Sequence, residues 1–266
     1  KAKAEPKGKA KAKGKSPGPP SKRRRTGGEL PSFPAALARP PLEQGEGPLR
    51  FLVVDVAEDA GNGAGASDIR LYGVTPAGNS VAACVRGFRT YFYCVRPVDA
   101  DGFEEEAFCK ALSSQLKDTG GEAGRAVPSA TRVRKRPLMY YQRDEVELLR
   151  VELSSPRLLP AASREVERGF AVPRASGEGT GASALDYQSP TWETNVPFVL
   201  RFMVDTGLVG GGWVELPADS FTVLGPEARR TSAQLEVTVP VDAVLARAPE
   251  GEFLGLAPLR LLTIDC

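Results

Sequence analysis

The feature that most constrains this 266-residue chain is a series of short apolar, β-branched runs separated by turn residues. The first run covers residues 51–56, and two more, 69–74 and 80–85, flank a Pro- and Gly-containing stretch at 75–79. Such a stretch between two strand-like runs is typical of a β-hairpin. We therefore predict that the folded part of the chain begins with three strands.

From residue 91 the pattern alternates between strands and helices. Strand-like runs lie at 91–95, 130–134 and 146–153, helix-like runs at 103–116 and 156–168, and a short apolar stub follows at Phe170. We expect Asp101 to cap the first helix, and Ser155, followed by Pro156, to cap the second. The resulting β-α-β-β-α-β order resembles a ferredoxin-type unit, which is also the order of RNA-recognition modules (RRM).

Beyond a Gly-, Ser- and Ala-rich linker at 174–184, the sequence predicts one more helix and four more strands. Asn195 is expected to cap a helix that ends near Gly207, and apolar residues occupy so much of its surface that most of it should be buried. Arg201 and Asp205, four residues apart on this helix, should form a local ion pair. The strands are expected at 213–216, 221–224, 235–241 and 259–264, so the fold class is α+β and β-rich.

Residues 1–48 differ in composition from the rest of the chain. They are mostly Lys, Ala, Gly and Pro, and they cannot bury enough apolar surface to offset the entropy of ordering, so we predict a disordered basic tail. The first 25 residues carry eleven Lys or Arg and one acid, Glu5, a net +10; since the whole chain is +2, the remainder sums to −8. Any nucleic-acid contact by this acidic body must come from local patches.

A dense basic run lies within the tail. It consists of Lys22, Arg23, Arg24 and Arg25. This density predicts a nuclear import signal, and therefore a nuclear location. A solubilising linker explains the same composition equally well.

The chain contains no histidine and only four cysteines, without a CxxC pair. Zinc fingers, Ser-His-Asp triads and Cys-His nucleophiles are therefore excluded. The scattered cysteines favour reduced thiols in a nuclear or cytosolic compartment over a disulfide framework. Because no apolar run approaches the length of a membrane span, no membrane partner is expected.

One basic and aromatic cluster stands out in the folded body. Its candidate nucleic-acid-binding residues are Arg132, Arg134, Lys135, Arg136, Tyr140 and Tyr141. Cationic and aromatic side chains together can bind a single strand, through phosphate contacts and base stacking. A solvated hairpin is the alternative interpretation.

A second stretch imitates part of an RRM signature. Arg86, Gly87 and Phe88, followed by Tyr93, copy part of the RNP1 pattern, whose aromatic residues stack on bases. The pattern fails in its middle, where Arg89 and two further residues replace a small residue and two strand residues. We therefore expect the aromatic residues of this strand to pack in the core rather than stack on bases.

The most distinctive stretch of the sequence is residues 189–210, which read SPTWETNVPFVLRFMVDTGLVG and lead into Trp213 and Leu216-Pro217. This stretch, with its distance to Trp213, resembles replicative DNA polymerases of family B, in particular the delta-like branch. Upstream, residues 71–81 and 87–93 are similar to its "FGVT..G.SV" and "GF.PYFY" segments, with Thr90 in place of Pro. Downstream, residues 256–265 resemble "APLR.LSFD". The resemblance covers roughly residues 50–266.

The resemblance implies a site and its cofactor. In the family, the carboxylate at the position of Asp265 and a Glu two positions later hold two metal ions for 3′–5′ hydrolysis. The sequence stops at Cys266, so the second carboxylate has no counterpart here, and both ends of the chain are expected to be cuts. We expect Mg²⁺ in the full-length enzyme and none in this segment, which should be inactive alone.

The resemblance also implies a domain organisation. We expect a tail at 1–48, a polymerase N-terminal domain with an RRM-like unit at 49–174, and the start of an RNase H-like exonuclease region at 185–266. The implied partners are template DNA, the remainder of the polymerase chain, and accessory replication subunits and a sliding clamp through the full-length protein. A free-standing RRM-like module that binds single-stranded nucleic acid is the alternative function.

Overall fold

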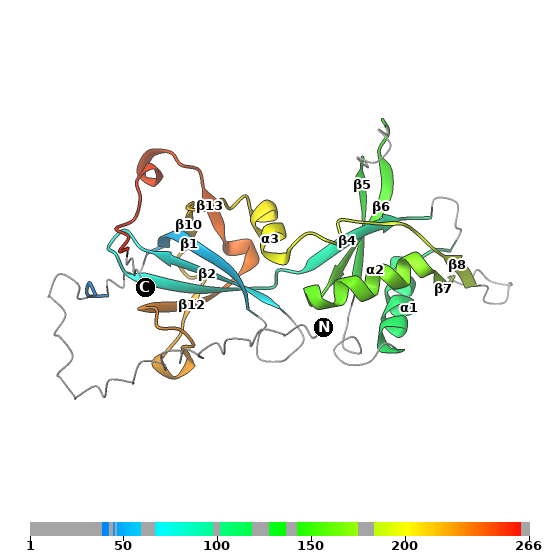
Figure 1. Cartoon of the computed structure of the whole chain (residues 1–266), viewed down its shortest axis with the longest axis horizontal. Helices are drawn as coiled ribbons and strands as arrows, with labels where there is room; N and C mark the ends of the chain where they lie inside the picture. The colour runs from blue at the N-terminus through cyan, green and yellow to red at the C-terminus, as the bar shows by residue number, and fades with distance from the viewer. Residues whose placement is uncertain are drawn as a thin grey trace, which may run out of the picture. The chain divides into compact units, whose positions relative to one another are not determined.

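The computed structural model describes residues 39–42, 45, 47–59, 67–97, 102–118, 128–136, 143–174 and 184–261 (Figure 1). The strands are β1 (Leu49–Asp59), β2 (Asp68–Val74), β3 (Ser80–Arg86), β4 (Thr90–Val95), β5 (Ser129–Lys135), β6 (Val146–Leu153), β7 (Phe170–Pro173), β8 (Ala184–Tyr187), β9 (Thr191–Trp192), β10 (Trp213–Leu216), β11 (Thr222–Val223), β12 (Leu235–Pro240) and β13 (Leu245–Arg247). The α-helices are α1 (Glu105–Asp118), α2 (Leu159–Arg168) and α3 (Phe198–Thr206), and the 3-10 helices are η4 (Pro156–Leu158), η5 (Pro226–Ala228), η6 (Val241–Ala243) and η7 (Gly251–Leu254).

The first three strands form the meander expected from the sequence and become the centre of a seven-stranded sheet. Its order is β11-β12-β3-β2-β1-β10-β13, with β12 parallel to β3 and the other pairs antiparallel. An OB-fold, which is a partly open Greek-key barrel, has the strand order seen here in β12-β3-β2-β1-β10, with α3 between β3 and β10 in sequence. We call these five strands the barrel. Strands from both halves of the chain therefore build one sheet.

Packing inside this sheet requires a glycine on β2. A Cβ atom added at Gly73 would lie 2.5 Å from the carbonyl oxygen of Leu52 and against the ring of Phe51. Phe51 is fully buried and belongs to the core under the sheet, so neither neighbour can move away cheaply. Gly73 thus allows the bulged strand β1 to approach β2.

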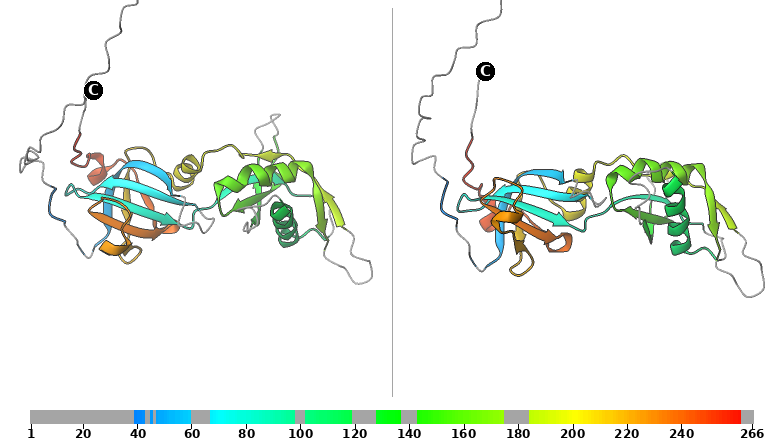
Figure 2. Two further views of the ribbon diagram at one scale, coloured as in Figure 1. Left: turned by 60° about the horizontal axis from the view of Figure 1, so that its bottom comes forward. Right: turned by 90° about the horizontal axis from the view of Figure 1, so that it is seen from below.

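The inserted segment between β3 and α3 forms a second core around a four-stranded sheet of order β5-β6-β4-β9. Helices α1 and α2 cover one face (Figure 2), where Phe108, Leu112 and Leu116 of α1 are fully buried as their spacing predicts. The side chain of Ser155 accepts a hydrogen bond from the backbone nitrogen of Arg157, so Ser155 caps the 3-10 helix η4. It does not cap α2, which begins at Leu159 with Leu158 as its N-cap and no side-chain capping bond. Asp101 lies outside the described residues.

One detail of the RRM-like prediction is wrong. The stub at Phe170 does not close the four-stranded sheet: β7 pairs with β8 in a separate two-stranded sheet, and the two-residue strand β9 lies beside β4 instead. The other three strands lie in the order β5-β6-β4, which is their order in a ferredoxin-type unit. The complete RRM-like unit stays a prediction.

Helix α3 differs from its prediction at its start and in its burial. It begins at Phe198 with Pro197 at the N-cap and no side-chain capping bond, so Asn195 does not cap it; it ends at Thr206, with Gly207 as the C-cap at φ of 71°. Phe198 and Phe202 pack on Phe88, each with ring centroids 5.3 Å apart. The prediction of a mostly buried helix is wrong, since the apolar side chains that face away from Phe88 are exposed: Leu200 is 50% and Val204 70% exposed.

Most of the predictions for the two ends of the chain fall on residues outside the described part. Residues 1–38 lie outside the described residues, but the described arm at 39–42 is bound to the barrel: Pro40 and Pro41 accept hydrogen bonds from the Asn79 side chain. The tail boundary expected at residue 48 stays a prediction. At the other end Leu259 to Leu261 are not in a strand, and residues 262–266 lie outside the described part. Among the described helices, none is long and apolar enough to cross a membrane.

Candidate nucleic-acid interface

Arg132, Arg134 and Lys135 of the predicted basic cluster lie on β5, an outer strand of the four-stranded sheet, and Arg136 follows its last residue. Because side chains alternate along a strand, its members do not share one face. Ala130 packs against the helix-covered core, so Arg132 and Arg134 lie on that side, whereas Val133 packs on the helix-free face, which Lys135 shares. The expected single cluster is therefore divided between two faces.

The basic residues of β5 also differ in their partners. Arg132 is paired with Glu105 of α1, at 3.1 Å between Nη2 and Oε1, and the same carboxylate accepts a hydrogen bond from Arg96 at 2.9 Å. Arg134 and Arg136 are exposed, and neither forms an ion pair with another described residue. Tyr140 and Tyr141, the aromatic half of the predicted cluster, lie outside the described residues.

The helix-free face of the sheet carries an aromatic pair. Tyr91 and Tyr93 on β4 meet edge to face with ring centroids 5.5 Å apart, and the Nζ atom of Lys135 lies 5.2 Å from the Tyr93 ring centroid. Both rings are buried, at 6% and 4% exposure. The prediction that these aromatic residues serve core packing is confirmed, since rings so covered have no free face for a base.

Tyr91 is the centre of a polar cluster that joins the sheet to α3. The guanidinium carbons of Arg150 on β6 and Arg201 on α3 lie 3.8 Å and 4.0 Å from its ring centroid. Its hydroxyl donates to Asp205 Oδ1 at 2.8 Å. Burial raises the pKa of Tyr91 to about 12, and the hydrogen bond to Asp205 acts in the same direction. The phenol therefore stays neutral at physiological pH.

Arg201 does not form the local ion pair predicted from its spacing to Asp205. Its guanidinium donates to the side chain and to the carbonyl of Glu193, each at 2.9 Å, and its side chain is only 3% exposed. Glu193 has φ of 60°, an uncommon backbone conformation for a residue with a side chain. The helical spacing was visible in the sequence, but the competing partner in the loop before α3 was not.

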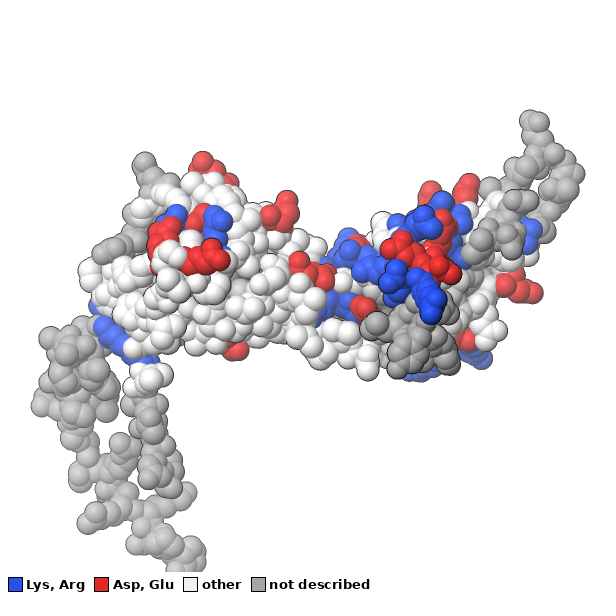
Figure 3. Space-filling model, turned by 90° about the horizontal axis from the view of Figure 1, so that it is seen from above, with Lys and Arg blue, Asp and Glu red and all other residues white. Residues whose placement is uncertain are grey.

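The charge on this face is mixed rather than basic. Around Tyr91 and Tyr93, Arg150 is balanced by Glu152 at 3.3 Å and lies 4.0 Å from Asp205. Figure 3 shows basic and acidic side chains intermingled in this way, without a continuous basic surface. Such a mixed surface can contact phosphates only locally, as we predicted from the net negative charge of the folded body.

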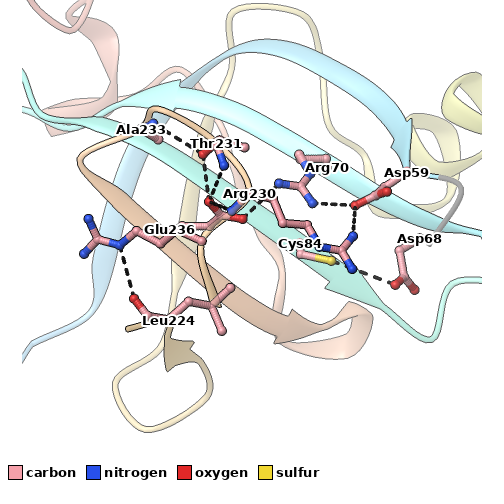
Figure 4. Close-up of polar contacts among 10 residues, drawn as sticks. Asp59, Asp68, Arg70, Cys84, Leu224, Arg230, Thr231, Ala233 and Glu236 are labelled. Atoms are coloured by element: carbon pink, nitrogen blue, oxygen red, sulfur yellow. Dashed lines mark hydrogen bonds and ion pairs between the residues drawn. The ribbon is translucent and has the colours of Figure 1, made fainter. Parts of the chain in front are cut away.

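A second polar cluster lies on the seven-stranded sheet, where Glu236 of β12 is 1% exposed (Figure 4). One of its carboxylate oxygens accepts from Arg70 at 3.0 Å, and the other accepts from the backbone nitrogens of Arg230 and Thr231 at 3.0 and 2.9 Å and from the Thr231 hydroxyl at 2.8 Å. Burial alone would raise the pKa of Glu236, but bonds from Thr231, Arg230 and Arg70 hold it below its usual value. The cluster fixes the loop before β12 on the sheet.

The described residues offer neither a metal site nor a reactive thiol. No group of three or more Cys, Asp or Glu side chains among them is placed to hold a metal ion. Burial raises the pKa of Cys94 to about 12 and that of Cys109 to about 11, so both thiols are protonated at neutral pH. Asp265, the predicted metal ligand, lies outside the described part of the chain.

Comparisons with known proteins agree with the motifs. Residues 189–266 match the family model described as DNA polymerase family B, exonuclease domain. The chain is 37% identical over 207 residues to the DNA polymerase delta catalytic subunit of Bos taurus, and 32% identical over 201 residues to that of Arabidopsis thaliana. Each match covers 74% of this chain and 17% of the relative, so the chain spans about a sixth of their length.

A solved structure of the family B DNA polymerase from the hyperthermophilic archaeon Pyrobaculum calidifontis aligns with 72% of this chain and 20% of its own, at 19% identity and a TM-score of 0.45. From the family model and the curated relatives, the predicted resemblance to a family B DNA polymerase of the delta type is confirmed.

Proposed function

We propose that this chain, which is similar to the family B DNA polymerases of the delta type, forms the N-terminal region of a replicative DNA-directed DNA polymerase with a 3′–5′ proofreading exonuclease. One observation carries the proposal. The exonuclease family match begins at residue 189, and residues within it, such as Phe202 and Val237, share one core with Phe51 and Leu71 of the preceding strands. The segment thus acts as a scaffold on which the exonuclease-family region is built.

The chemistry of the proposed enzyme belongs to the longer protein. Hydrolysis at a DNA 3′ end by two metal ions needs several carboxylates in one small volume. Asp265 would be the first of them, holding Mg²⁺ together with a Glu two positions later. Residues 1–266 alone are therefore inactive in DNA synthesis and in degradation. DNA, accessory subunits and a sliding clamp would be partners of the whole enzyme, in the nucleus.

The transcript sequence beyond the codon for Cys266 tests this proposal. We expect the next codon to encode Glu, which completes an Asp-x-Glu motif, and a strand with paired aspartates of a polymerase palm far downstream. A stop codon directly after Cys266 would contradict the proposal and favour the free-standing RRM-like module. Incubating pure polypeptide 1–266 with Mg²⁺ and a labelled primer is a second test, since any metal-dependent degradation would disprove the inactivity of this segment alone.

We also propose that template DNA contacts this region along β5. Arg134, Lys135 and Arg136 are exposed at the outer edge of the sheet, where a single strand can reach side chains of both faces. Arg132 should contribute less, because Glu105 already neutralises it. The competing explanation is that charged side chains on an outer strand prevent edge-to-edge aggregation.

Salt-dependent binding separates the two explanations. On a polypeptide of residues 39–266, which lacks the basic tail, Arg134→Ser with Lys135→Ser and Arg136→Ser should flatten the slope of log affinity against log salt by about 0.7 per lost phosphate contact. Arg132→Ser should change the slope less. Arg164→Ser with Arg168→Ser, two exposed arginines on α2, are the matched control and should leave it unchanged. An equal effect of the control, or no binding at low salt, would refute the β5 contact.

A further inference from the structure

The loop before β12 places one exposed hydroxyl next to a rigid anchor. Glu236 holds the backbone nitrogens of Arg230 and Thr231 against the sheet, so the loop is fixed as far as Thr231 (Figure 4). Ser232 follows directly, is exposed, and its hydroxyl has no hydrogen-bond partner among the described residues. A serine in this position can be reached by a modifying enzyme.

Two arginines precede this serine at the third and second positions before it. Arg230 has a side chain that is 41% exposed, and its Nη1 atom lies 3.6 Å from Asp59. Among the described residues, the guanidinium of Arg229 bonds only to the carbonyl of Leu224, from Nε at 3.3 Å, so its terminal nitrogens are available to a kinase. Arginine-directed protein kinases recognise such a pair with carboxylates, because a guanidinium can donate two parallel hydrogen bonds to a carboxylate.

We propose that Ser232 is a phosphorylation site for an arginine-directed serine/threonine kinase. The Ser232 Oγ atom attacks the γ-phosphorus of ATP and loses its proton to the kinase's catalytic base. The bond between the β–γ bridging oxygen and the γ-phosphorus breaks, and ADP leaves with the electron pair. The product carries a charge of about −1.5 to −2 on the loop.

Arg39 places a positive charge next to the proposed phosphate group. The Nη1 atom of Arg39 donates to the Ser232 carbonyl at 2.8 Å, so the Arg39 guanidinium lies beside the modified residue. The arm that contains Arg39 is also held by Gln234, whose Nε2 atom donates to the Pro40 carbonyl at 2.8 Å. Phosphorylation adds a charge-assisted bond between Arg39 and the phosphate, and so strengthens the attachment of the arm to the barrel. In sequence, this arm joins the Lys- and Arg-rich segment to β1.

The first test is phosphorylation of the full 266-residue chain by an arginine-directed kinase catalytic subunit and ATP, with sites assigned by mass spectrometry. Thr26 follows Arg23 and Arg24 at the same spacing, so all variants carry Thr26→Ala. We expect one phosphate on Ser232, its loss in Ser232→Ala, and at least a tenfold slower reaction in Arg229→Ala, with Arg164→Ala as an unchanged control. An unmodified Ser232, or an equal reaction of Arg229→Ala and the control, would overturn the proposal.

The second test measures the contact with Arg39. A ³¹P NMR titration gives the second pKa of phosphoserine, which is about 6 without a partner. We expect a lower pKa in the phosphorylated chain, because Arg39 stabilises the dianion, and a return toward the ordinary value in Arg39→Gln. The same pKa in both proteins would show that Arg39 does not bind the phosphate and would overturn the arm attachment.

Discussion

The hydroxyl of Tyr91 offers a single-atom test of the cluster that joins the four-stranded sheet to α3. Tyr91→Phe removes the hydrogen bond to Asp205 Oδ1 but keeps the ring between Arg150 and Arg201. A hydrogen bond to a charged group contributes about 1.5 to 3 kcal/mol. Because the Asp205 side chain is 27% exposed, water can partly replace the donor, and we expect a loss near the lower end, about 1.5 kcal/mol.

Tyr91→Leu should cost more, because it also removes the ring. Two cation–π contacts are then lost, each contributing about 0.5 to 1 kcal/mol, so the total loss should reach about 3 kcal/mol. Urea denaturation followed by circular dichroism measures both values. Tyr72→Phe, a half-buried tyrosine on β2, is the matched control and should stay within about 0.5 kcal/mol of the parent protein.

The pH dependence gives an independent measure of the same contact. The pKa of Tyr91 is raised to about 12 in the folded chain, against about 10 in the unfolded one. The neutral phenol is thus favoured by folding, so its contribution is complete below pH 10 and is lost as pH rises toward 12. The stability difference between parent and Tyr91→Phe should shrink over that interval. A Tyr91→Phe variant as stable as the parent at pH 7 would refute the reasoning.

Three further predictions concern the barrel and the tail. Glu236→Gln should lower the free energy of unfolding by about 3 kcal/mol, since it removes the negative charge that pairs with the buried Arg70. Because the pKa of Glu236 is lowered, the parent protein should lose this stability as pH falls below 4.5, an acid sensitivity that the variant should lack in urea titrations. Gly73→Ala should destabilise by at least about 2 kcal/mol, measured by thermal unfolding, because the added Cβ meets the Leu52 carbonyl, whereas Gly210→Ala, with open space around it, should be nearly neutral. Changing Lys22, Arg23, Arg24 and Arg25 to Ala should exclude a fluorescent fusion from nuclei, and normal entry of that variant would contradict the import signal.

The sequence predicts local structure well where β-branched runs and turn residues agree. Strands β2, β3 and β6 are observed within one residue of their predicted bounds, because turn-forming Gly, Pro, Asn, Asp or Ser residues lie beside their ends and β-branched residues favour a strand within them. Strand β13 was missed, since Leu245–Arg247 is too short for a periodic pattern and is held only by pairing with β10. Pairing between strands that are distant in the sequence produces no recognisable pattern in either strand's own residues.

The candidate site was harder to predict for the same reason. Arg150 and Arg201 both lie against the Tyr91 ring, because β6 pairs with β4 and α3 follows an inserted segment. The spacing of residues in the sequence does not reveal this arrangement. Arg201 in particular has the helical spacing of a surface ion pair, yet it is buried against Glu193. The division of the β5 cluster could have been inferred from strand alternation alone, which places Arg132 and Lys135 on opposite faces.

The most direct test of the proposed function uses the full-length product of the transcript, assayed with Mg²⁺ for primer extension and for degradation of a mismatched 3′ end. We expect both activities in the parent enzyme, and we expect Asp265→Ala to abolish degradation while primer extension persists, because that carboxylate would hold metal only in the exonuclease site. Degradation at an unchanged rate in Asp265→Ala, or a full-length product without metal-dependent extension, would contradict the proposed function.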